Sequence, residues 1–260
     1  MIKNNIFSLK NKNALITGGG GLLGQEHAKA LLDSECKIML IDLNFNKVEK
    51  CLIDHKDVIL KKVDITSIKS LINLRNFINK KKIKIDILIN NAAINSKPGK
   101  IKNLDQQIKE WKKELEVSLT GNFLCTKIIG EIISKNPKGG VILNISSDLA
   151  LISPDQRLYR KNKLAEKNPS YSVVKHGITG LTKYFATYWA DKNVRCNALL
   201  PGGIKNKQKK TFIKDLTSRI PLNRMADKNE YHGSIKFLCS DASKYMNGQS
   251  LVLDGGRTIW

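Results

Sequence analysis

Four consecutive glycines follow a short apolar segment near the start of the chain, and this junction constrains the fold more than any other feature. Residues 13–17 have strand character, and the apolar side chains from Leu22 to Leu32 recur at near-helical spacing. A strand, a glycine turn and a helix bring backbone N–H groups and a helix N-terminus against a pyrophosphate. The next apolar run ends at Asp42, at a suitable distance to hydrogen-bond a ribose 2′-hydroxyl. The junction therefore predicts a dinucleotide-binding fold.

Strand-like runs alternate with helix-patterned stretches along the whole chain. This alternation is typical of an α/β protein in which a doubly wound, seven-stranded parallel sheet has helices on both faces. The chain has no linker and no internal repeat, so residues 1–260 are predicted to form a single domain. The predicted strands are 13–17, 37–42, 58–63, 85–89, 140–145, 194–199 and 250–254.

Two segments, 148–168 and 203–222, interrupt this alternation. The first is polar and charged, and the second carries a lysine-rich run followed by a proline. Both follow predicted strands at their carboxyl ends, which is where open α/β sheets bind ligands. We therefore expect the two segments to form the substrate pocket, the second as a mobile lid.

Tyr171 and Lys175 are the strongest candidates for catalysis. Residues four positions apart share one face of a helix, so the phenol and the ammonium can point into the same cleft. A nearby ammonium stabilises phenolate and is expected to lower the phenol pKa from about 10 towards neutrality. Tyr171 could then exchange a proton with an alcohol or carbonyl oxygen. The same spacing is common on solvated helices, so this interpretation depends on the other motifs.

Several motifs occur in the order found in the short-chain dehydrogenase/reductase family, which the chain resembles from about Lys10 to its last residue. They are Thr17-Gly-Gly-Gly-Gly-Leu-Leu-Gly24, Asn90-Asn-Ala-Ala93, Asn144-Ile-Ser-Ser147, Tyr171-Ser-Val-Val-Lys175, Pro201-Gly-Gly-Ile204 and Leu253-Asp-Gly-Gly256. The resemblance implies a Rossmann fold and a nicotinamide coenzyme. It assigns coenzyme contacts to Gly18, Gly20, Gly21, Leu22, Leu23, Gly24, Asp42, Leu43, Asp64, Ile65, Asn91, Ala92, Ala93, Tyr171, Lys175, Pro201, Gly202 and Ile204.

The resemblance also assigns the catalytic residues. Tyr171 is implied to be the general acid/base, Lys175 its partner and Ser147 the catalytic serine. Ser118 stands where the family usually has an asparagine that helps to hold a water in the proton relay behind the lysine. A serine can still hydrogen-bond a water, and Asn122 lies one helical turn further on, so either residue could complete the relay.

Some positions depart from the classical branch of the family. Leu22 and Ala93 stand where glycines are usual, and the gap between Ser147 and Tyr171 is longer than in most classical members. The glycine loop also fits the extended branch, which contains nucleotide-sugar epimerases and dehydratases. A chain of 260 residues leaves little room for the substrate domain of that branch. The resemblance therefore favours a classical member with an insertion before the tyrosine.

The insertion suggests a substrate class, because its two arginines are suited to carboxylate or phosphate groups. We expect it to contact an anionic or sugar-like substrate. The alternative is a solvated loop, which would leave the pocket to Asn95 and 203–222. The insertion and the C-terminal residues resemble short-chain dehydrogenases linked to bacterial surface-sugar synthesis, that of nonulosonic acids and flagellin glycans. The predicted substrate residues are Ser147, Asp155, Gln156, Arg157, Tyr159, Arg160, Tyr171 and Gly203.

The formal net charge of +22 would suit a nucleic-acid binder. Nearly all of this charge is lysine, however, which recognises planar phosphate targets less well than arginine, and the lysine runs contain no aromatic residues. We therefore expect no nucleic-acid partner, although the positive field should attract anionic substrates. The five cysteines look like thiols of a reducing compartment, and the four histidines show no metal-ligand spacing, so no metal is expected. Without a signal peptide or a spanning segment, the protein is expected to be cytoplasmic, with no membrane partner.

Together these features predict an NAD(H)-dependent oxidoreductase that interconverts an alcohol and a carbonyl on a polar small molecule. Asp42 should favour NAD over NADP because its carboxylate would repel a 2′-phosphate. Two alternatives remain. One is a nucleotide-sugar epimerase or dehydratase with tightly held NAD, and the other is a non-catalytic nucleotide-binding protein.

A homodimer or homotetramer is also expected. Residues 105–136 and 169–190 resemble the helices through which the family assembles, and they carry more apolar residues than one core-facing side requires. These apolar residues are Leu115, Leu119, Phe123, Ile178, Leu181, Phe185 and Trp189.

Overall fold

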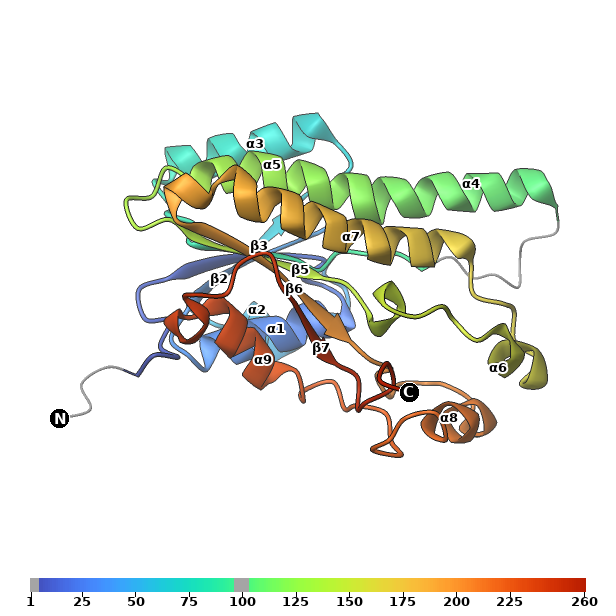
Figure 1. Cartoon of the computed structure of the whole chain (residues 1–260). Coiled ribbons are helices and arrows are strands. Elements are labelled where there is room, and N and C mark those ends of the chain that lie inside the picture. Colours follow the sequence, from blue (N-terminus) through green and yellow to red (C-terminus); the bar gives the residue numbers. More distant parts are fainter. Residues whose placement is uncertain (1–4, 96–102) are drawn as a thin grey trace.

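The computed structural model describes residues 5–95 and 103–260. Its strands form one parallel sheet in the order β3-β2-β1-β4-β5-β6-β7, with helices on both faces, as Figure 1 shows. The predicted doubly wound Rossmann fold is therefore confirmed. The strands are β1 (Asn13–Thr17), β2 (Lys37–Asp42), β3 (Val58–Lys62), β4 (Ile87–Asn90), β5 (Gly140–Ile145), β6 (Val194–Pro201) and β7 (Ser250–Leu253).

The helices form two layers around the sheet (Figure 1). One face is covered by α1 (Leu22–Leu32), α2 (Lys50–Ile53) and α9 (His232–Cys239). The other is covered by α3 (Ile68–Lys80), α4 (Leu104–Leu115), α5 (Gly121–Ile133) and α7 (Pro169–Tyr188). Two short helices, α6 (Gln156–Lys161) and α8 (Lys210–Thr217), belong to the two segments that interrupt the sequence alternation, and they lie next to each other.

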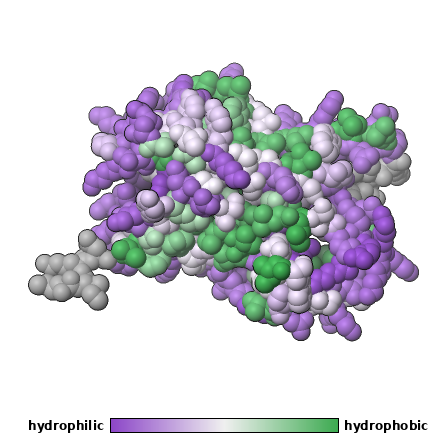
Figure 2. All heavy atoms as spheres, viewed as in Figure 1, coloured by the Kyte–Doolittle hydropathy of each residue, from purple (hydrophilic) through white to green (hydrophobic). Residues whose placement is uncertain are grey.

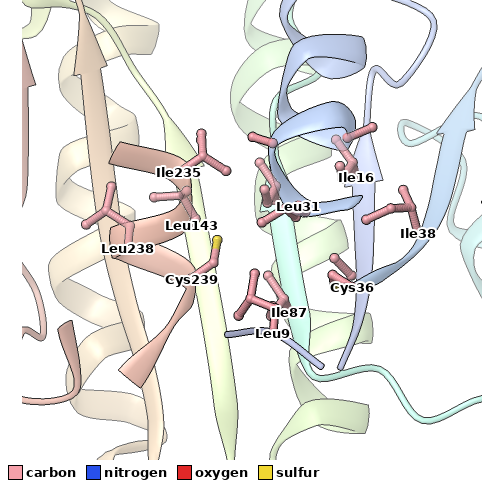
Figure 3. Close-up of a cluster of buried hydrophobic side chains, with 14 of the residues drawn as sticks. Leu9, Ile16, Leu31, Cys36, Ile38, Ile87, Leu143, Ile235, Leu238 and Cys239 are labelled. Atoms are coloured by element: carbon pink, nitrogen blue, oxygen red, sulfur yellow. The ribbon is translucent and has the colours of Figure 1, made fainter. Parts of the chain in front are cut away.

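Burial on both faces explains why the central strands are continuous apolar runs. In β2, Ile38 and Leu40 pack in the cluster under α1 and α9, whereas Met39 and Ile41 pack in the cluster under α3 and α5. Figure 3 shows the first of these clusters between the sheet and its helices. Its labelled members are Leu9, Ile16, Leu31, Cys36, Ile38, Ile87, Leu143, Ile235, Leu238 and Cys239.

The helix that follows the β4 loop is interrupted once. Between α4 and α5, residues Glu116–Thr120 form a single π-helical turn around the buried Ser118. Such turns are often found at functional sites. Directly after it, a Cβ on Gly121 would lie 2.8 Å from Cδ1 of Ile65, so glycine permits this helix to approach the chain that follows β3. The π turn thereby places Ser118 at the carboxyl edge of the sheet.

The visible surface is largely hydrophilic, as expected from the charge. Figure 2 shows a green apolar area along β7 and the chain that follows it. Among the residues that the structure describes, strand β7 pairs only with β6, so its outer edge has no neighbouring strand there. No helix in the described ranges is long and apolar enough to cross a membrane.

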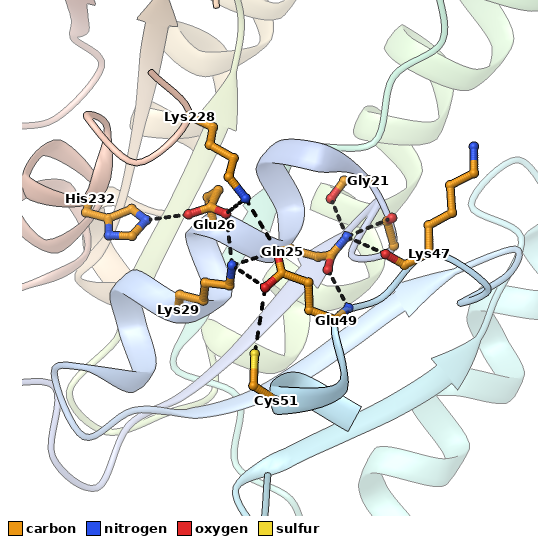
Figure 4. A network of polar contacts seen from close by, with 10 residues as sticks. Gly21, Gln25, Glu26, Lys29, Lys47, Glu49, Cys51, Lys228 and His232 are labelled. Carbon is orange, nitrogen blue, oxygen red and sulfur yellow. Dashed lines mark hydrogen bonds and ion pairs between the residues drawn. The ribbon is translucent and has the colours of Figure 1, made fainter. Parts of the chain in front are cut away.

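A charged network ties the glycine-loop helix α1 to the opposite end of the chain (Figure 4). Glu26, whose side chain is 4% exposed, accepts from Lys29 at 3.0 Å, from Lys228 at 2.8 Å and from His232 at 3.0 Å. Burial alone would raise the pKa of Glu26, but the bonds from Lys228, Lys29 and His232 outweigh it and lower the pKa to about 2. The ionised carboxylate therefore stabilises the packing of α1 against α9.

We predict that Glu26→Gln destabilises the protein at pH 7 by about 2 kcal/mol, because it removes a carboxylate that two lysines and a histidine share. The folded pKa of Glu26 is depressed, so its contribution is complete above the unfolded value of about 4.5 and is lost as the pH falls towards 2. In urea unfolding, the difference in unfolding free energy between the wild type and Glu26→Gln should thus become smaller below about pH 4.5. Glu35→Gln, at an exposed acid, is the matched control and should have little effect. A difference in unfolding free energy that does not change with pH would contradict the depressed pKa of Glu26.

Candidate active site

The loops after β1 and β4 are locked together by hydrogen bonds. The Thr17 hydroxyl oxygen accepts from the backbone N–H groups of Asn91 at 3.0 Å and Ala92 at 2.9 Å. In return, the side-chain amide of Asn91 donates to the carbonyls of Thr17 at 3.0 Å and Gly18 at 3.1 Å. This lock fixes the glycine loop at the point where the strand order changes direction, which is where doubly wound sheets bind nucleotides.

Glycine is required where the loop meets its neighbours. Gly18 has a φ of +64°, and a Cβ there would lie 2.7 Å from Cα of Ala92. At Gly24 a Cβ would lie 2.2 Å from the carbonyl oxygen of Gly18. Gly21 precedes α1 without a side-chain cap, so the N–H groups of the first helical turn have no side-chain acceptor there. The first turn of α1 therefore offers the open donors, and the glycine loop the bare backbone, that a pyrophosphate needs.

Asp42 supports the same loop from the end of β2. One of its carboxylate oxygens accepts from Gly20 N at 2.9 Å, and the other accepts from Leu43 N at 2.6 Å. The carboxylate also lines a cavity of about 290 Å³ next to the glycine loop. Asp64, in the wall of this cavity, is held by Thr66, whose hydroxyl donates to it at 2.7 Å.

This cavity is lined by half of the residues expected at the coenzyme. From that set it is lined by Gly18, Gly21, Asp42, Leu43, Asp64, Ile65, Asn91, Ala92 and Ala93. Gly20, Leu22 and Gly24 do not line it: Gly20 is bonded to Asp42, Gly24 packs under the loop, and Leu22 is 42% exposed at the start of α1. The glycine cradle, the uncapped helix and Asp42 suit a dinucleotide, with its pyrophosphate at the loop and a ribose at the carboxylate.

A second cavity, of about 480 Å³, shares the lining residues Asn91 and Ala93 with the first and therefore lies next to it. Ser147, Tyr171 and Lys175 all line it. The predicted residues Leu23, Pro201, Gly202, Gly203 and Ile204 line it as well. The structure thus brings the three catalytic candidates together in one cleft beside the coenzyme cavity.

The protonation of Tyr171 differs from the sequence-based expectation. Burial raises the pKa of Tyr171 to about 12, and the hydrogen bond with Ser147 offsets only part of this effect. Lys175 Nζ donates to the Ile145 carbonyl at 3.1 Å and lies 5.6 Å from the centre of the Tyr171 ring. Burial also lowers the pKa of Lys175 to about 8, with a further contribution from Lys167. In this structure the expected lowering of the phenol pKa is therefore wrong, because desolvation exceeds the effect of the Ser147 hydrogen bond and the nearby Asp148 carboxylate raises the pKa further.

Ser118 and Asn122, the two candidates for the proton relay, have different partners. The Ser118 hydroxyl oxygen accepts from Ile94 N at 3.0 Å, just after the β4 loop. Asn122 instead accepts from the Thr126 hydroxyl at 3.3 Å, in a buried network that runs on to Asn90. Ser118 is therefore close to the cleft loops, whereas Asn122 belongs to the interior. The catalytic role of Ser118 stays a prediction.

The arginines of the insertion do not face the cleft. Arg157 pairs with Asp155 at 2.8 Å and its side chain is 84% exposed, and Arg160 pairs with Glu166 at 2.5 Å. Neither lines the cleft, because each is held at the surface by an acid of the same insertion. Gln156 also points away, since its side-chain amide bonds the Lys167 backbone in both directions. The expectation that these residues contact a substrate directly is not met by this geometry.

The insertion contributes to the cleft through other side chains. Leu158 and Tyr159 of α6 pack against Phe212 and Leu216 of α8, and all four line the cleft. An ion pair of 2.7 Å between Lys161 and Asp215 joins the same two helices at the surface. The two irregular segments therefore form one wall together.

Three charged residues of the cleft were missed in the sequence analysis. The Ser147 hydroxyl donates to Asp148 at 2.8 Å, and Arg257 donates to the other oxygen of Asp148 at 2.6 Å. Both charged side chains are nearly buried. The third residue is Lys167, which lies over the Tyr171 ring. Lys167 lies before α7 begins at Pro169, so the four-residue spacing of a helix face does not apply to it and no local pattern indicated its position.

The comparisons with known proteins agree with this geometry. A family model described as Enoyl-(Acyl carrier protein) reductase matches residues 21–258. The 2-dehydro-3-deoxy-D-gluconate 5-dehydrogenase of Bacillus subtilis is 32% identical over 261 residues, which cover 96% of each chain. The chain belongs to the short-chain dehydrogenase/reductase family.

Two further members of the short-chain dehydrogenase/reductase family cover nearly the whole chain. Post-translational flagellin modification protein A of Campylobacter coli is 29% identical, over 95% of this chain and 98% of that protein. The crystal structure of a short chain dehydrogenase from Leptospira borgpetersenii with bound NAD⁺ superimposes with a TM-score of 0.87 at 29% identity, over 99% of this chain and 97% of that one. The predicted family is confirmed, and these full-length matches support the classical branch.

Proposed function

We propose that the protein is an NAD(H)-dependent oxidoreductase that interconverts an alcohol and a carbonyl on a polar small molecule. The observation that carries this proposal is the meeting of Ser147, Tyr171 and Lys175 in a cleft that lies next to the coenzyme cavity. The bound nicotinamide would supply or accept the hydride. The glycine loop, Asn91 and Asp42 would hold the dinucleotide, and the segment from Pro201 to Ile204 would lie beside its nicotinamide end.

Each catalytic side chain has a distinct task in this proposal. Tyr171 exchanges a proton with the reacting oxygen of the substrate, and the Ser147 hydroxyl holds that oxygen by a hydrogen bond. Lys175 stabilises the negative charge that develops on Tyr171 and contacts the coenzyme ribose. Since burial raises the pKa of Tyr171, the phenol is protonated at neutral pH but is a weak acid, so proton transfer in either direction depends on Lys175 and Ser147 to stabilise the phenolate.

We predict that Tyr171→Phe abolishes turnover, by at least about a thousandfold, and leaves NADH binding nearly unchanged, because it removes only the proton-exchanging hydroxyl. Steady-state rates and NADH fluorescence titration measure the two effects. Tyr245→Phe, at a fully exposed tyrosine, is the control and should keep full activity. More than a few per cent of wild-type activity in Tyr171→Phe would show that another group is the acid. Purified protein that retains stoichiometric NAD through turnover would favour an epimerase or dehydratase instead.

We propose that NAD is the preferred coenzyme, because the Asp42 carboxylate lines the cavity beside the glycine loop. We predict NADH binding at least about tenfold tighter than NADPH binding, since a 2′-phosphate would meet a carboxylate. Asp42→Asn should narrow this difference, whereas Asp54→Asn, at an exposed acid, should not. Titration of each variant with both reduced coenzymes checks this, and equal or tighter NADPH binding by the wild type would overturn it.

We further propose a cytoplasmic homo-oligomer, built through the α4–α5 and α7 surface. Of the apolar residues expected there, Ile178, Phe185 and Trp189 are core residues, so they do not contribute to the surface. Phe123 is 41% exposed, and Tyr184 and Tyr188, 57% and 44% exposed, stack on each other at 5.7 Å. Exposed aromatic surface of this kind suits a partner copy, and the open apolar edge at β7 offers a second contact.

We predict a dimer or tetramer by light scattering at micromolar concentration, and a shift towards monomer in Tyr188→Glu, because a carboxylate would have to be buried in the contact. Lys183→Glu, an exposed charge reversal on the same helix, tests whether added negative charge alone has this effect. A monomeric mass of the wild type would rule out the assembly, and recovery of the protein with membranes in cell fractionation would contradict the cytoplasmic location.

A further inference from the structure

Lys167 is held in a defined position at the edge of the catalytic cleft. Gln156 accepts from the Lys167 N–H at 2.9 Å and donates to its carbonyl at 3.0 Å, so the insertion clamps this peptide from both sides. The ammonium lies 3.8 Å from the centre of the Tyr171 ring and donates to Asn95 Oδ1 at 3.2 Å. The insertion therefore acts on the cleft by placing a cation beside the reacting phenol.

This cation has no carboxylate partner within ion-pair distance among the residues that the structure describes. The other charged groups near it are committed elsewhere: Asp148 pairs with Arg257, and Glu114 accepts a hydrogen bond from Ser170. Burial lowers the pKa of Lys167 to about 8, although Glu114 and Asp148 attract its charge from a distance. An ammonium has three donors, and the described partners are one amide oxygen and one ring face. A largely desolvated ammonium of this kind gains from an anion supplied by a ligand.

We infer that Lys167 binds the carboxylate of the substrate, and that the substrate is therefore a hydroxy acid or the corresponding keto acid. This inference rests on the proposed oxidoreductase function. Lys167 and Tyr171 both line the cleft, and the ammonium covers one face of the phenol ring, so one small molecule can place its carboxylate at Lys167 and its alcohol oxygen at Tyr171 and Ser147.

A carboxylate fits this arrangement better than a phosphate. Phosphate sites usually present several donors, most often from arginine, around a more highly charged group. The arginine of this cleft, Arg257, has a guanidinium N–H bonded to Asp148, and the Asp148 carboxylate would repel a dianion in the same space. Because Arg257 offsets most of the charge of Asp148, a ligand with a single negative charge can still enter the cleft. Apart from Lys175, which donates to the Ile145 carbonyl, the described cleft residues thus combine one unpaired cation, Lys167, with one compensated ion pair.

The test compares acids with neutral alcohols of the same skeleton, using D-gluconate with D-glucitol and 3-hydroxybutyrate with 2-butanol. Calorimetry of each compound with the protein and saturating NADH measures binding without turnover, and kcat/KM with NAD⁺ measures use as a substrate. In at least one pair, the wild type should bind the acid tenfold to a hundredfold more tightly than the alcohol, as expected for a charge-assisted hydrogen bond.

Substitutions identify the group responsible. Lys167→Gln should lose most of the preference for the acid over the neutral alcohol, whereas Lys167→Arg should keep most of this preference. Lys163→Gln, at an exposed lysine of the same insertion, should match the wild type. Gln156→Leu should weaken acid binding with little change in kcat for the alcohol, because Gln156 positions Lys167 without contacting substrate.

Two results would overturn the inference. In one, the wild type binds neither acid more tightly than its matching alcohol. In the other, Lys167→Gln prefers the acid as strongly as the wild type does. Two measurements together separate this inference from the proposed function: the turnover of Tyr171→Phe, and acid binding by the wild type and Lys167→Gln. If Tyr171→Phe keeps turnover but the wild type and Lys167→Gln differ in acid binding, only the assigned proton donor fails. If Tyr171→Phe loses turnover but Lys167→Gln binds acids as the wild type does, only the carboxylate site fails.

Discussion

The lock between the β1 and β4 loops is the interaction on which the rest of the site depends. Parallel strands end at one edge of the sheet, so the residues that follow β1, β2, β4 and β5 meet there without long connections. Thr17 and Asn91 exchange hydrogen bonds across this edge and hold the glycine loop against Ala92. Because the backbone approaches so closely, the loop can only be glycine at Gly18 and Gly24. Coenzyme binding and the position of the catalytic cleft are therefore set by the same few contacts.

Much of the fold and of the coenzyme site could be predicted from the sequence, because local patterns determine them. Continuous apolar runs reveal strands buried on both faces, and the glycine loop reveals where the backbone must remain bare. Asp42 was identified because the end of a strand fixes where its side chain must lie. The four-residue spacing of Tyr171 and Lys175 predicted a shared helix face, and both side chains do line one cleft. These inferences need only the geometry of one element or of two consecutive elements.

The direction of charged side chains in the insertion could not be predicted in this way. Arg157 and Arg160 looked suited to an anionic substrate, yet each has an acid of its own segment within reach, and a surface ion pair is formed more readily than a buried contact. The pairing of Asp148 with Arg257 joins residues 109 positions apart, so no local pattern indicates it. The pKa of Tyr171 depends on how completely the surrounding helices and loops exclude water, which spacing along a helix does not reveal.

Two lysines, Lys167 and Lys175, lie near the Tyr171 ring and determine much of the charge in the cleft. Burial lowers the pKa of both to about 8, so both are predominantly charged at pH 7. An anion at Lys167 would raise the pKa of that lysine and, by itself, would oppose the formation of phenolate at Tyr171. Lys175, which donates to the Ile145 carbonyl on the interior side, would then be left to stabilise the charge on the phenol. A cleft with a single lysine would have to use one cation for both charges. With Lys167 supplied by the insertion, an anionic group of the substrate and the developing phenolate would each have a lysine of their own.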